Sequence, residues 1–256
     1  MQEAVRFENK KGYKLAGLIE RPDYGDIEGF IILVHGLTGD KNEHGLFAKA
    51  GTYFCRKNFS VFRFDITGCG ESEGDFQYVG IADQKEDFLS AIKFVKAKER
   101  IGNEDIYVIG FSLGATVALL AYQSILGVKG LSLWNPVLFP ERDVYPKYQT
   151  AEIVKELESR GYFLKNGLKV GRKIVSDLSG CSLVSVIRSV RSPTSLVQGE
   201  EDRVVNPEST EIGAVLFNCL PKFISIPGAD HFFRFPAGAF YRVLSETSDF
   251  FESIRT

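Results

Sequence analysis

Short, mostly apolar runs of strand length recur along the chain, and they constrain its fold more than any other feature of the sequence. Four occur before residue 135: Phe30–Val34, Ser60–Phe64, Ile106–Ile109 and Leu131–Trp134. Two more follow later: Thr194–Val197 and Lys222–Ile226. Continuous apolar runs of this kind are typical of strands that are buried on both faces of a parallel sheet.

Segments with helical spacing separate these runs. In Ile81–Lys98 the apolar residues Phe88, Ile92 and Val95 fall on one face of a helix. Three more helices are predicted, at Ser112–Ile125, Glu208–Phe217 and Phe240–Ile254. Alternation of strands and helices indicates an α/β fold with a mainly parallel, doubly wound sheet and right-handed crossovers.

The N-terminal segment has a different pattern. Two apolar-rich runs, Val5–Phe7 and Leu15–Ile19, flank the turn residues Asn9–Gly12. Because turn residues between two strand-like runs favour a hairpin, we expect an antiparallel pair of strands before the parallel sheet.

A long segment, residues 135–191, interrupts the alternation between two predicted core strands. It contains a charged helical run, Ala151–Arg160, and a hairpin signal around Lys165–Gly167. Segments of this length are usually more than connections. We therefore expect one domain, residues 1–256, in which residues 135–191 form a small inserted lid.

The composition of the chain limits the cellular location and the classes of binding partner that we expect. The formal net charge of −2 over 256 residues gives no electrostatic reason to expect binding to nucleic acid or to an anionic membrane. The four cysteines form no CxxC pair, so neither a zinc site nor a redox motif is predicted. No secretory signal and no apolar stretch of about 20 residues occurs, which favours a cytoplasmic protein without a membrane span. Monomer and homodimer both remain open.

The strongest chemical signal is the G-x-S-x-G sequence of Gly110–Gly114. It follows the predicted strand Ile106–Ile109 and begins a predicted helix. Such a turn exposes a serine hydroxyl above the sheet, beside the helix N-terminus, where it can act as a nucleophile. A simpler interpretation is a glycine-bounded turn in which Ser112 caps the helix.

A serine hydroxyl needs a base, and the chain has only three histidines. His35 ends the strand Phe30–Val34, and we expect it to shape a loop. His44 lies in the polar loop Asp40–Gly45, and we expect it at the surface. His231 follows the last predicted strand, at the edge of the sheet where open α/β sheets hold their sites, and it is the predicted general base.

The acid that orients this base should follow the preceding strand, Thr194–Val197. Three consecutive acids, Glu200, Glu201 and Asp202, stand there. The first two could be solvated, and the third could cap a turn. We favour Asp202 because it follows the strand-ending Gly199 by three residues, which gives the chain order Ser…Asp…His.

Acyl transfer also requires donors for the oxyanion. The backbone N–H of Leu113, directly after Ser112, is one candidate. The backbone N–H of Leu37, in the loop after the first parallel strand, is the other. Together with Ser112, Asp202 and His231, these residues make up the predicted site.

Several motifs together resemble those of the α/β-hydrolase superfamily, within it the cinnamoyl (feruloyl) esterases and the monoacylglycerol-lipase-like hydrolases. The matching segments are His35–Lys41, Arg63–Asp65, Gly68–Gly74, Gly110–Gly114, Asp202 and Ala229–Phe232. The resemblance runs over nearly the whole chain. It departs at Cys69, where relatives often carry His or Tyr, and at Leu37, where many carry Phe.

This resemblance implies a serine carboxylesterase that works through an acyl-enzyme on a small-molecule ester, with no metal or organic cofactor. Aryl (cinnamoyl-type) and short to medium acyl esters both remain candidates. A thioesterase, an acyltransferase or a peptidase would use the same three side chains. A non-catalytic ligand-binding protein of the same fold is the alternative from another class.

Overall fold

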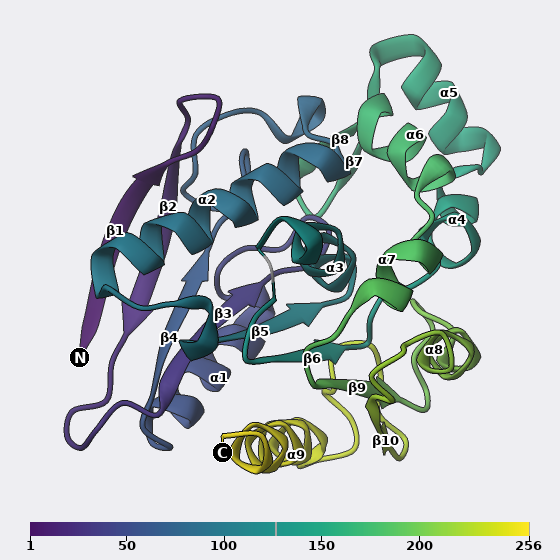
Figure 1. The fold of residues 1–256 in the computed structure, drawn as a ribbon. Coiled ribbons are helices and arrows are strands. Elements are labelled where there is room, and N and C mark those ends of the chain that lie inside the picture. Colours follow the sequence, from purple (N-terminus) through teal and green to yellow (C-terminus); the bar gives the residue numbers. More distant parts are fainter. Residues whose placement is uncertain (126, 256) are drawn as a thin grey trace.

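A single eight-stranded sheet organises the chain in the computed structural model, which describes residues 1–125 and 127–255 (Figure 1). The strand order is β1-β2-β4-β3-β5-β6-β9-β10, and the six strands from β4 to β10 in this order are parallel. β1 pairs antiparallel with β2, and β2 pairs antiparallel with β4. The predicted parallel sheet and N-terminal hairpin are confirmed. The strands are β1 (Gln2–Glu8), β2 (Lys14–Glu20), β3 (Gly29–Val34), β4 (Phe59–Phe64), β5 (Ile106–Phe111), β6 (Gly130–Trp134), β9 (Thr194–Gly199) and β10 (Lys222–Ile226).

Helices cover both faces of this sheet, which explains why its central strands are apolar throughout. Along β3, Phe30, Ile32 and Val34 pack with side chains of the helices α2 and α3, whereas Ile31 and Leu33 pack with those of α1 and α9. Successive side chains of a strand point to opposite faces, so a strand between two helical layers buries every residue. The helices outside the segment 135–191 are α1 (Leu46–Cys55), α2 (Ile81–Glu99), α3 (Leu113–Ile125), α8 (Pro207–Ala214) and α9 (Ala239–Ser253), with 3-10 turns at Glu43–Gly45, Phe76–Tyr78 and Asn103–Asp105.

The helix α1 was not predicted from the sequence. Its buried residues Leu46, Phe47, Ala50 and Phe54 have helical spacing, so the sequence does contain a pattern that predicts this helix. A glycine and a β-branched threonine in its middle lower the helix propensity, and packing against the sheet outweighs that preference. Of the predicted helices, α8 ends at Ala214 rather than at Phe217.

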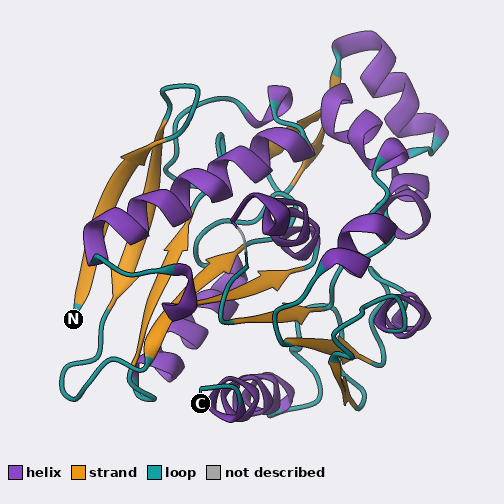
Figure 2. Ribbon diagram, viewed as in Figure 1, coloured by secondary structure: helices purple, strands orange, loops and turns teal. Residues whose placement is uncertain are grey.

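The segment between β6 and β9 is mainly helical and carries one short hairpin (Figure 2). The predicted helix Ala151–Arg160 is α5, and the predicted hairpin is β7 (Tyr162–Lys165) paired antiparallel with β8 (Leu168–Gly171). The sequence did not predict the helices α6 and α7, of which α7 packs against α3. The remaining elements are α4 (Pro140–Asp143), the 3-10 helix η4 (Tyr145–Tyr148), α6 (Arg172–Gly180) and α7 (Val184–Ser189).

None of the helices in the described residues combines the length and the apolar character that a membrane span requires.

Candidate active site

Ser112 stands at the sharp turn between β5 and α3. Its φ angle is +53°, a left-handed conformation that is unfavourable for a serine. Both flanking glycines are required by close packing. A Cβ at Gly114 would lie 2.1 Å from the carbonyl oxygen of Val34, and one at Gly110 would lie 2.7 Å from Cα of Ala115. The G-x-S-x-G pattern therefore lets α3 approach the sheet and holds the serine in a strained turn.

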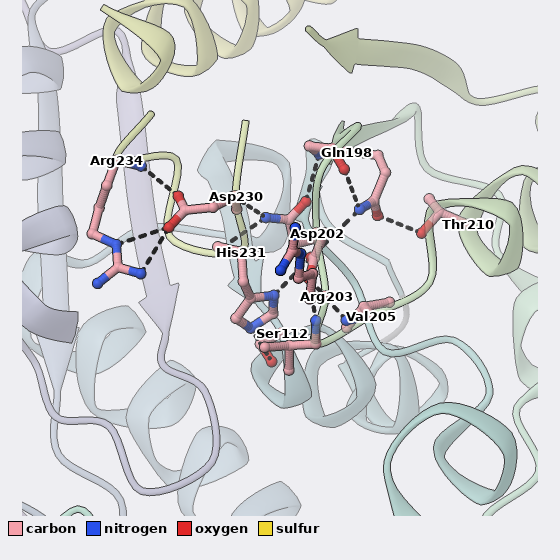
Figure 3. Close-up of polar contacts among 12 residues, drawn as sticks. Ser112, Gln198, Asp202, Arg203, Val205, Thr210, Asp230, His231 and Arg234 are labelled. Atoms are coloured by element: carbon pink, nitrogen blue, oxygen red, sulfur yellow. Dashed lines mark hydrogen bonds and ion pairs between the residues drawn. The ribbon is translucent and has the colours of Figure 1, made fainter. Parts of the chain in front are cut away.

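The structure brings Ser112, His231 and Asp202 together (Figure 3). Nε2 of His231 lies 3.1 Å from Oγ of Ser112, and Nδ1 lies 2.7 Å from Oδ2 of Asp202. A carboxylate only accepts hydrogen bonds, so Nδ1 of His231 must carry the hydrogen that it donates to Asp202. A neutral imidazole has only one N–H group, and Nε2 is therefore free to accept a hydrogen bond from Ser112. This tautomer can take the proton of the serine hydroxyl.

The carboxylate of Asp202 is completely buried and fixed by its own loop. Oδ1 accepts hydrogen bonds from the backbone N–H groups of Val204 (2.7 Å) and Val205 (2.9 Å), which leaves Oδ2 to face the imidazole. The neighbouring acids Glu200 and Glu201 are both exposed, and Glu200 accepts from the hydroxyl of Ser225. Of the three consecutive acids, Asp202 is the one beside His231.

Asn135, which the sequence analysis did not identify, connects the end of β6 to the end of β9 and to the loop that carries His231. Its Nδ2 donates to the carbonyl oxygen of His231 at 2.7 Å, and its Oδ1 accepts from the N–H of Gly199 at 2.7 Å. It thereby fixes the backbone of His231 relative to the end of β9. The signal available in the sequence was weak: a polar residue at the carboxyl end of a buried strand.

The loop after β3 is held by two buried side chains. Nδ1 of His35 lies 2.8 Å from the carbonyl oxygen of Gly36, and Nε2 accepts from the N–H of Ile66 at 3.0 Å. His35 therefore shapes the loop, as expected, and burial lowers the pKa of its imidazole. The neutral ring suits both contacts, because one nitrogen donates and the other accepts.

Glu43 is the second of these side chains and was not singled out from the sequence. Its Oε2 accepts from the N–H of Gly36 at 2.6 Å, and its side chain fills the space beside Gly39, where a Cβ would lie 2.4 Å away. Burial raises the pKa of this carboxyl to about 8, with a smaller contribution from the charge of Asp40. Because Glu43 lies in a polar loop, it resembled a solvated residue in the sequence.

Both predicted oxyanion donors, the N–H groups of Leu37 and Leu113, belong to residues that line the cavity above Ser112. Neither N–H donates to another group within the described part of the chain. They come from the two loops at the carboxyl ends of adjacent strands, β3 and β5. Two residues whose N–H groups have no acceptor in the described chain therefore line the same cavity as Ser112.

The cavity has a volume of about 1160 Å³ and reaches from Ser112 to the inserted segment. Its apolar lining comes from the sheet and from the insert alike: Leu37, Phe111, Val137, Tyr148, Phe163 and Phe232. His44 is exposed, as predicted, but its ring also contacts Phe232 at a centroid distance of 5.2 Å and lines the cavity. Phe111 and Phe232 both pack against the ring of His231.

Similar proteins agree with this architecture. The family model described as serine aminopeptidase, S33, matches residues 25–179. The uncharacterized protein YfhR of Salmonella typhimurium is 25% identical over 234 residues, which cover 90% of this chain and 74% of that protein.

Two solved structures share the fold at low sequence identity. Est1E from Butyrivibrio proteoclasticus, solved with ferulic acid, superposes with a TM-score of 0.82 at 20% identity and covers 97% of this chain and 98% of its own. DcsB, solved in complex with its substrate analogue, gives a TM-score of 0.81 at 18% identity, with complete coverage of both chains. The matched family model spans more than half of the sequence, and the chain belongs to the serine aminopeptidase, S33, family of the α/β-hydrolase superfamily.

Proposed function

We propose that this hydrolase is a serine carboxylic ester hydrolase in which Ser112 is the nucleophile, His231 the general base and Asp202 the residue that orients the base. One observation carries the proposal: Nε2 of His231 lies 3.1 Å from Oγ of Ser112 while Nδ1 lies 2.7 Å from Asp202. An ordinary capping serine would need neither contact, nor the left-handed turn that carries it.

The mechanism has two steps. His231 takes the proton of Ser112 as Oγ attacks the ester carbonyl, and the N–H groups of Leu37 and Leu113 stabilise the oxyanion. His231 then gives the proton to the leaving alcohol, and an acyl-enzyme remains. In the second step His231 activates a water molecule that hydrolyses the acyl-enzyme and restores the free serine.

Residues 135–191 would act as a lid that forms one wall of the substrate cavity within the single domain. The insert supplies Tyr148 and Phe163, whose rings pack at 5.1 Å, to the lining. Aromatic walls suit a flat acyl group. Est1E binds ferulic acid, and its resemblance to this chain makes aryl esters the first substrates to test, before short and medium acyl esters.

The family description makes an aminopeptidase the second candidate. Such an enzyme must bind the α-ammonium group of a peptide, which requires a free carboxylate near the serine. Of the three glutamates in the cavity wall, Glu43 is buried against Gly36 and Glu156 pairs with Arg160, which leaves Glu152. Basic side chains outnumber acidic ones in the same lining, and their positive charge opposes the binding of an α-ammonium group at Glu152, so this lining favours ester hydrolysis.

Two experiments test the proposal. A fluorophosphonate probe should label the wild-type protein, and Ser112→Ala should abolish the labelling, whereas undiminished labelling of the variant would refute the nucleophile. A panel of p-nitrophenyl esters of graded chain length, methyl ferulate and amino acid p-nitroanilides should show turnover of esters over anilides. Faster turnover of the anilides would favour the aminopeptidase.

A further inference from the structure

The cavity above Ser112 carries far more positive than negative side chains, although the whole chain has a formal charge of −2. Its acidic side chains are Glu43, Glu152 and Glu156. Its basic side chains are Lys49, Lys147, Arg160, Lys165, Arg203 and Arg234. The charges available to a ligand are those of side chains that form no ion pair within the protein.

Two of the basic groups are already neutralised. Arg160 pairs with Glu156 at 2.7 Å, and Arg234 pairs with Asp230 at 2.8 Å. On the acidic side, Glu43 is buried, and its raised pKa of about 8 keeps most of this carboxyl protonated near neutral pH. After these pairs are removed, one carboxylate faces the cavity together with four cations.

None of the four remaining cations, Lys49, Lys147, Lys165 and Arg203, forms an ion pair within residues 1–125 and 127–255. Lys147 is held by hydrogen bonds from Nζ to the carbonyl oxygens of Arg203 (3.3 Å) and Val204. Lys165 and Arg203 make no side-chain hydrogen bond to the described chain, so both are available to a ligand.

Three of these cations come from neighbouring segments, because Lys147 contacts the backbone of Arg203 and feels the charge of Lys165. Lys147 lies on η4, Lys165 on β7, and Arg203 on the loop that carries Asp202. Burial lowers the pKa of Lys147, the carboxylates of Asp202 and Asp143 oppose this shift, and the positive charge of Lys165 adds to it, so the ammonium groups of Lys147 and Lys165 lie close enough to act on each other. Asp202 and Asp143 already pair with His231 and Arg142, whereas Lys165 and Arg203 pair with no carboxylate of the described residues, so their positive charges can attract an anion.

We infer that the preferred ester substrates carry a second, anionic group, a carboxylate or a phosphate, which binds Lys165 of the insert and Arg203 of the loop after β9. This inference rests on the proposed ester hydrolysis and names its substrate class. Arginine suits the role because its guanidinium forms paired hydrogen bonds with such oxyanions. Substrates with a cationic group are disfavoured by the same residues.

Matched esters test this inference with the full-length protein. Monoethyl adipate and diethyl adipate differ in one carboxylate, and 1-hexanoylglycerol 3-phosphate and 1-hexanoylglycerol differ in one phosphate. We expect kcat/KM of the wild-type protein to be at least about 10-fold higher for the anionic member of one pair at low salt. The pair that responds identifies the anion, and the preference should shrink as salt rises because salt screens charges.

Variants assign the effect to the two residues. Lys165→Gln combined with Arg203→Gln should lower the anionic-to-neutral ratio of kcat/KM by about 10-fold. Lys93 is an exposed lysine on α2 outside the cavity; Lys93→Gln removes one positive charge, as each of the two substitutions does, and should keep the wild-type ratio. Lys147 is left intact because its contacts hold the loop of Asp202.

A wild-type ratio near one for both pairs, or a double variant with the ratio of Lys93→Gln, would overturn the inference. Protection of Ser112 against the fluorophosphonate by each ester gives a second readout that needs no turnover, and equal protection by both members of each pair would also overturn it. Loss of ester hydrolysis and of probe labelling in the wild-type protein is a different result, since it refutes the proposed function itself.

Discussion

The side-chain amide of Asn166 donates a 3.0 Å hydrogen bond to the hydroxyl of Thr38. Asn166 is at the tip of the β7–β8 hairpin, and Thr38 belongs to the loop after β3. The same hydroxyl donates to the carbonyl oxygen of Leu37 at 2.6 Å. A single chain of hydrogen bonds therefore joins the inserted segment to the loop that carries a proposed oxyanion donor.

This contact predicts that Asn166→Gly lowers kcat for a small ester such as p-nitrophenyl acetate by about 3- to 30-fold, with little change in KM. Complete loss of an oxyanion donor costs about 100- to 1000-fold, and loosening one should cost less. Glycine suits the position because Asn166 has a φ of +50°, so the turn is kept while the amide is removed. Steady-state kinetics on the small ester measures the effect.

Thr38 provides the matched controls. Thr38→Val removes the hydroxyl and should resemble Asn166→Gly, whereas Thr38→Ser keeps it and should restore most of kcat. Asn166→Asp should also be impaired, because it places an acceptor opposite an oxygen whose only hydrogen is donated to Leu37. Wild-type kcat in both Asn166→Gly and Thr38→Val would show that the hairpin does not position the loop.

The Asp202 carboxylate should be essential to the rate. In Asp202→Asn, the new Oδ1 can still accept from Val204 and Val205, which turns the NH2 group towards His231. Nδ1 would then have to accept, and its hydrogen would move to Nε2, which could no longer take the proton of Ser112. We expect kcat to fall by about 10³- to 10⁴-fold while the protein stays folded.

Glu201→Gln is the matched control, because Glu201 is an exposed acid in the same loop. It should change the free energy of unfolding by no more than about 0.5 kcal/mol and leave kcat near the wild-type value. If Glu201→Gln lowered kcat strongly and Asp202→Asn did not, the carboxylate that orients His231 would be Glu201 rather than Asp202.

The buried carboxyl of Glu43 should make stability depend on pH. Its pKa is raised from 4.5 to about 8, so the folded protein binds this proton more tightly than the unfolded chain does. The stability that results is complete below about pH 4.5 and is lost as pH rises through about 8. Glu43→Gln removes this titration and can still accept from the N–H of Gly36.

Urea unfolding at pH 5, 7 and 9 measures this effect. Wild type loses this stability as pH rises and Glu43→Gln does not, so the free energy of unfolding of the variant minus that of wild type should increase by about 2 to 4 kcal/mol between pH 5 and pH 9. The difference between the two proteins cancels the other titrating groups. Parallel pH curves for the two proteins would mean that Glu43 ionises in the folded state as easily as in the unfolded chain.

The sequence predicted most of the fold because the fold's main signals are local. Strands buried on both faces are apolar throughout, and a glycine-flanked serine between a strand and a helix is recognised within a few residues. The arrangement of Ser112, Asp202 and His231 followed from their positions after the carboxyl ends of three parallel strands, β5, β9 and β10. That step used the topology of parallel sheets rather than any contact visible in the sequence.

The supporting contacts could not be predicted because they join distant segments. Asn135 and His231 are 96 positions apart, and Thr38 and Asn166 are 128 positions apart. Asparagine is common in turns, so neither Asn135 nor Asn166 is unusual at its position in the sequence. The raised pKa of Glu43 depends on burial, which helices and loops from several parts of the chain produce together.

The proposed lid role of the insert gives the last prediction. Residues 151–171 comprise α5, β7 and β8 and contribute many side chains to the cavity wall, among them Ile153, Phe163 and Leu164. Replacing these residues with a short Gly/Ser linker keeps α6, whose buried Ile174 and Leu178 pack in the core. The variant should remain folded by circular dichroism and still react with a small fluorophosphonate at Ser112.

Across bulky aryl and medium-chain esters, the same deletion should lower or reorder kcat/KM by about 10-fold or more, because one wall of the cavity is gone. The deletion also removes Asn166, so Asn166→Gly is the necessary comparison: it lacks the hydrogen bond to Thr38 but keeps the wall. A lid predicts that the substrate order changes only in the deletion variant, since loosening the oxyanion loop slows all esters alike. A folded deletion variant with the substrate order of Asn166→Gly would show that residues 151–171 do not select the substrate.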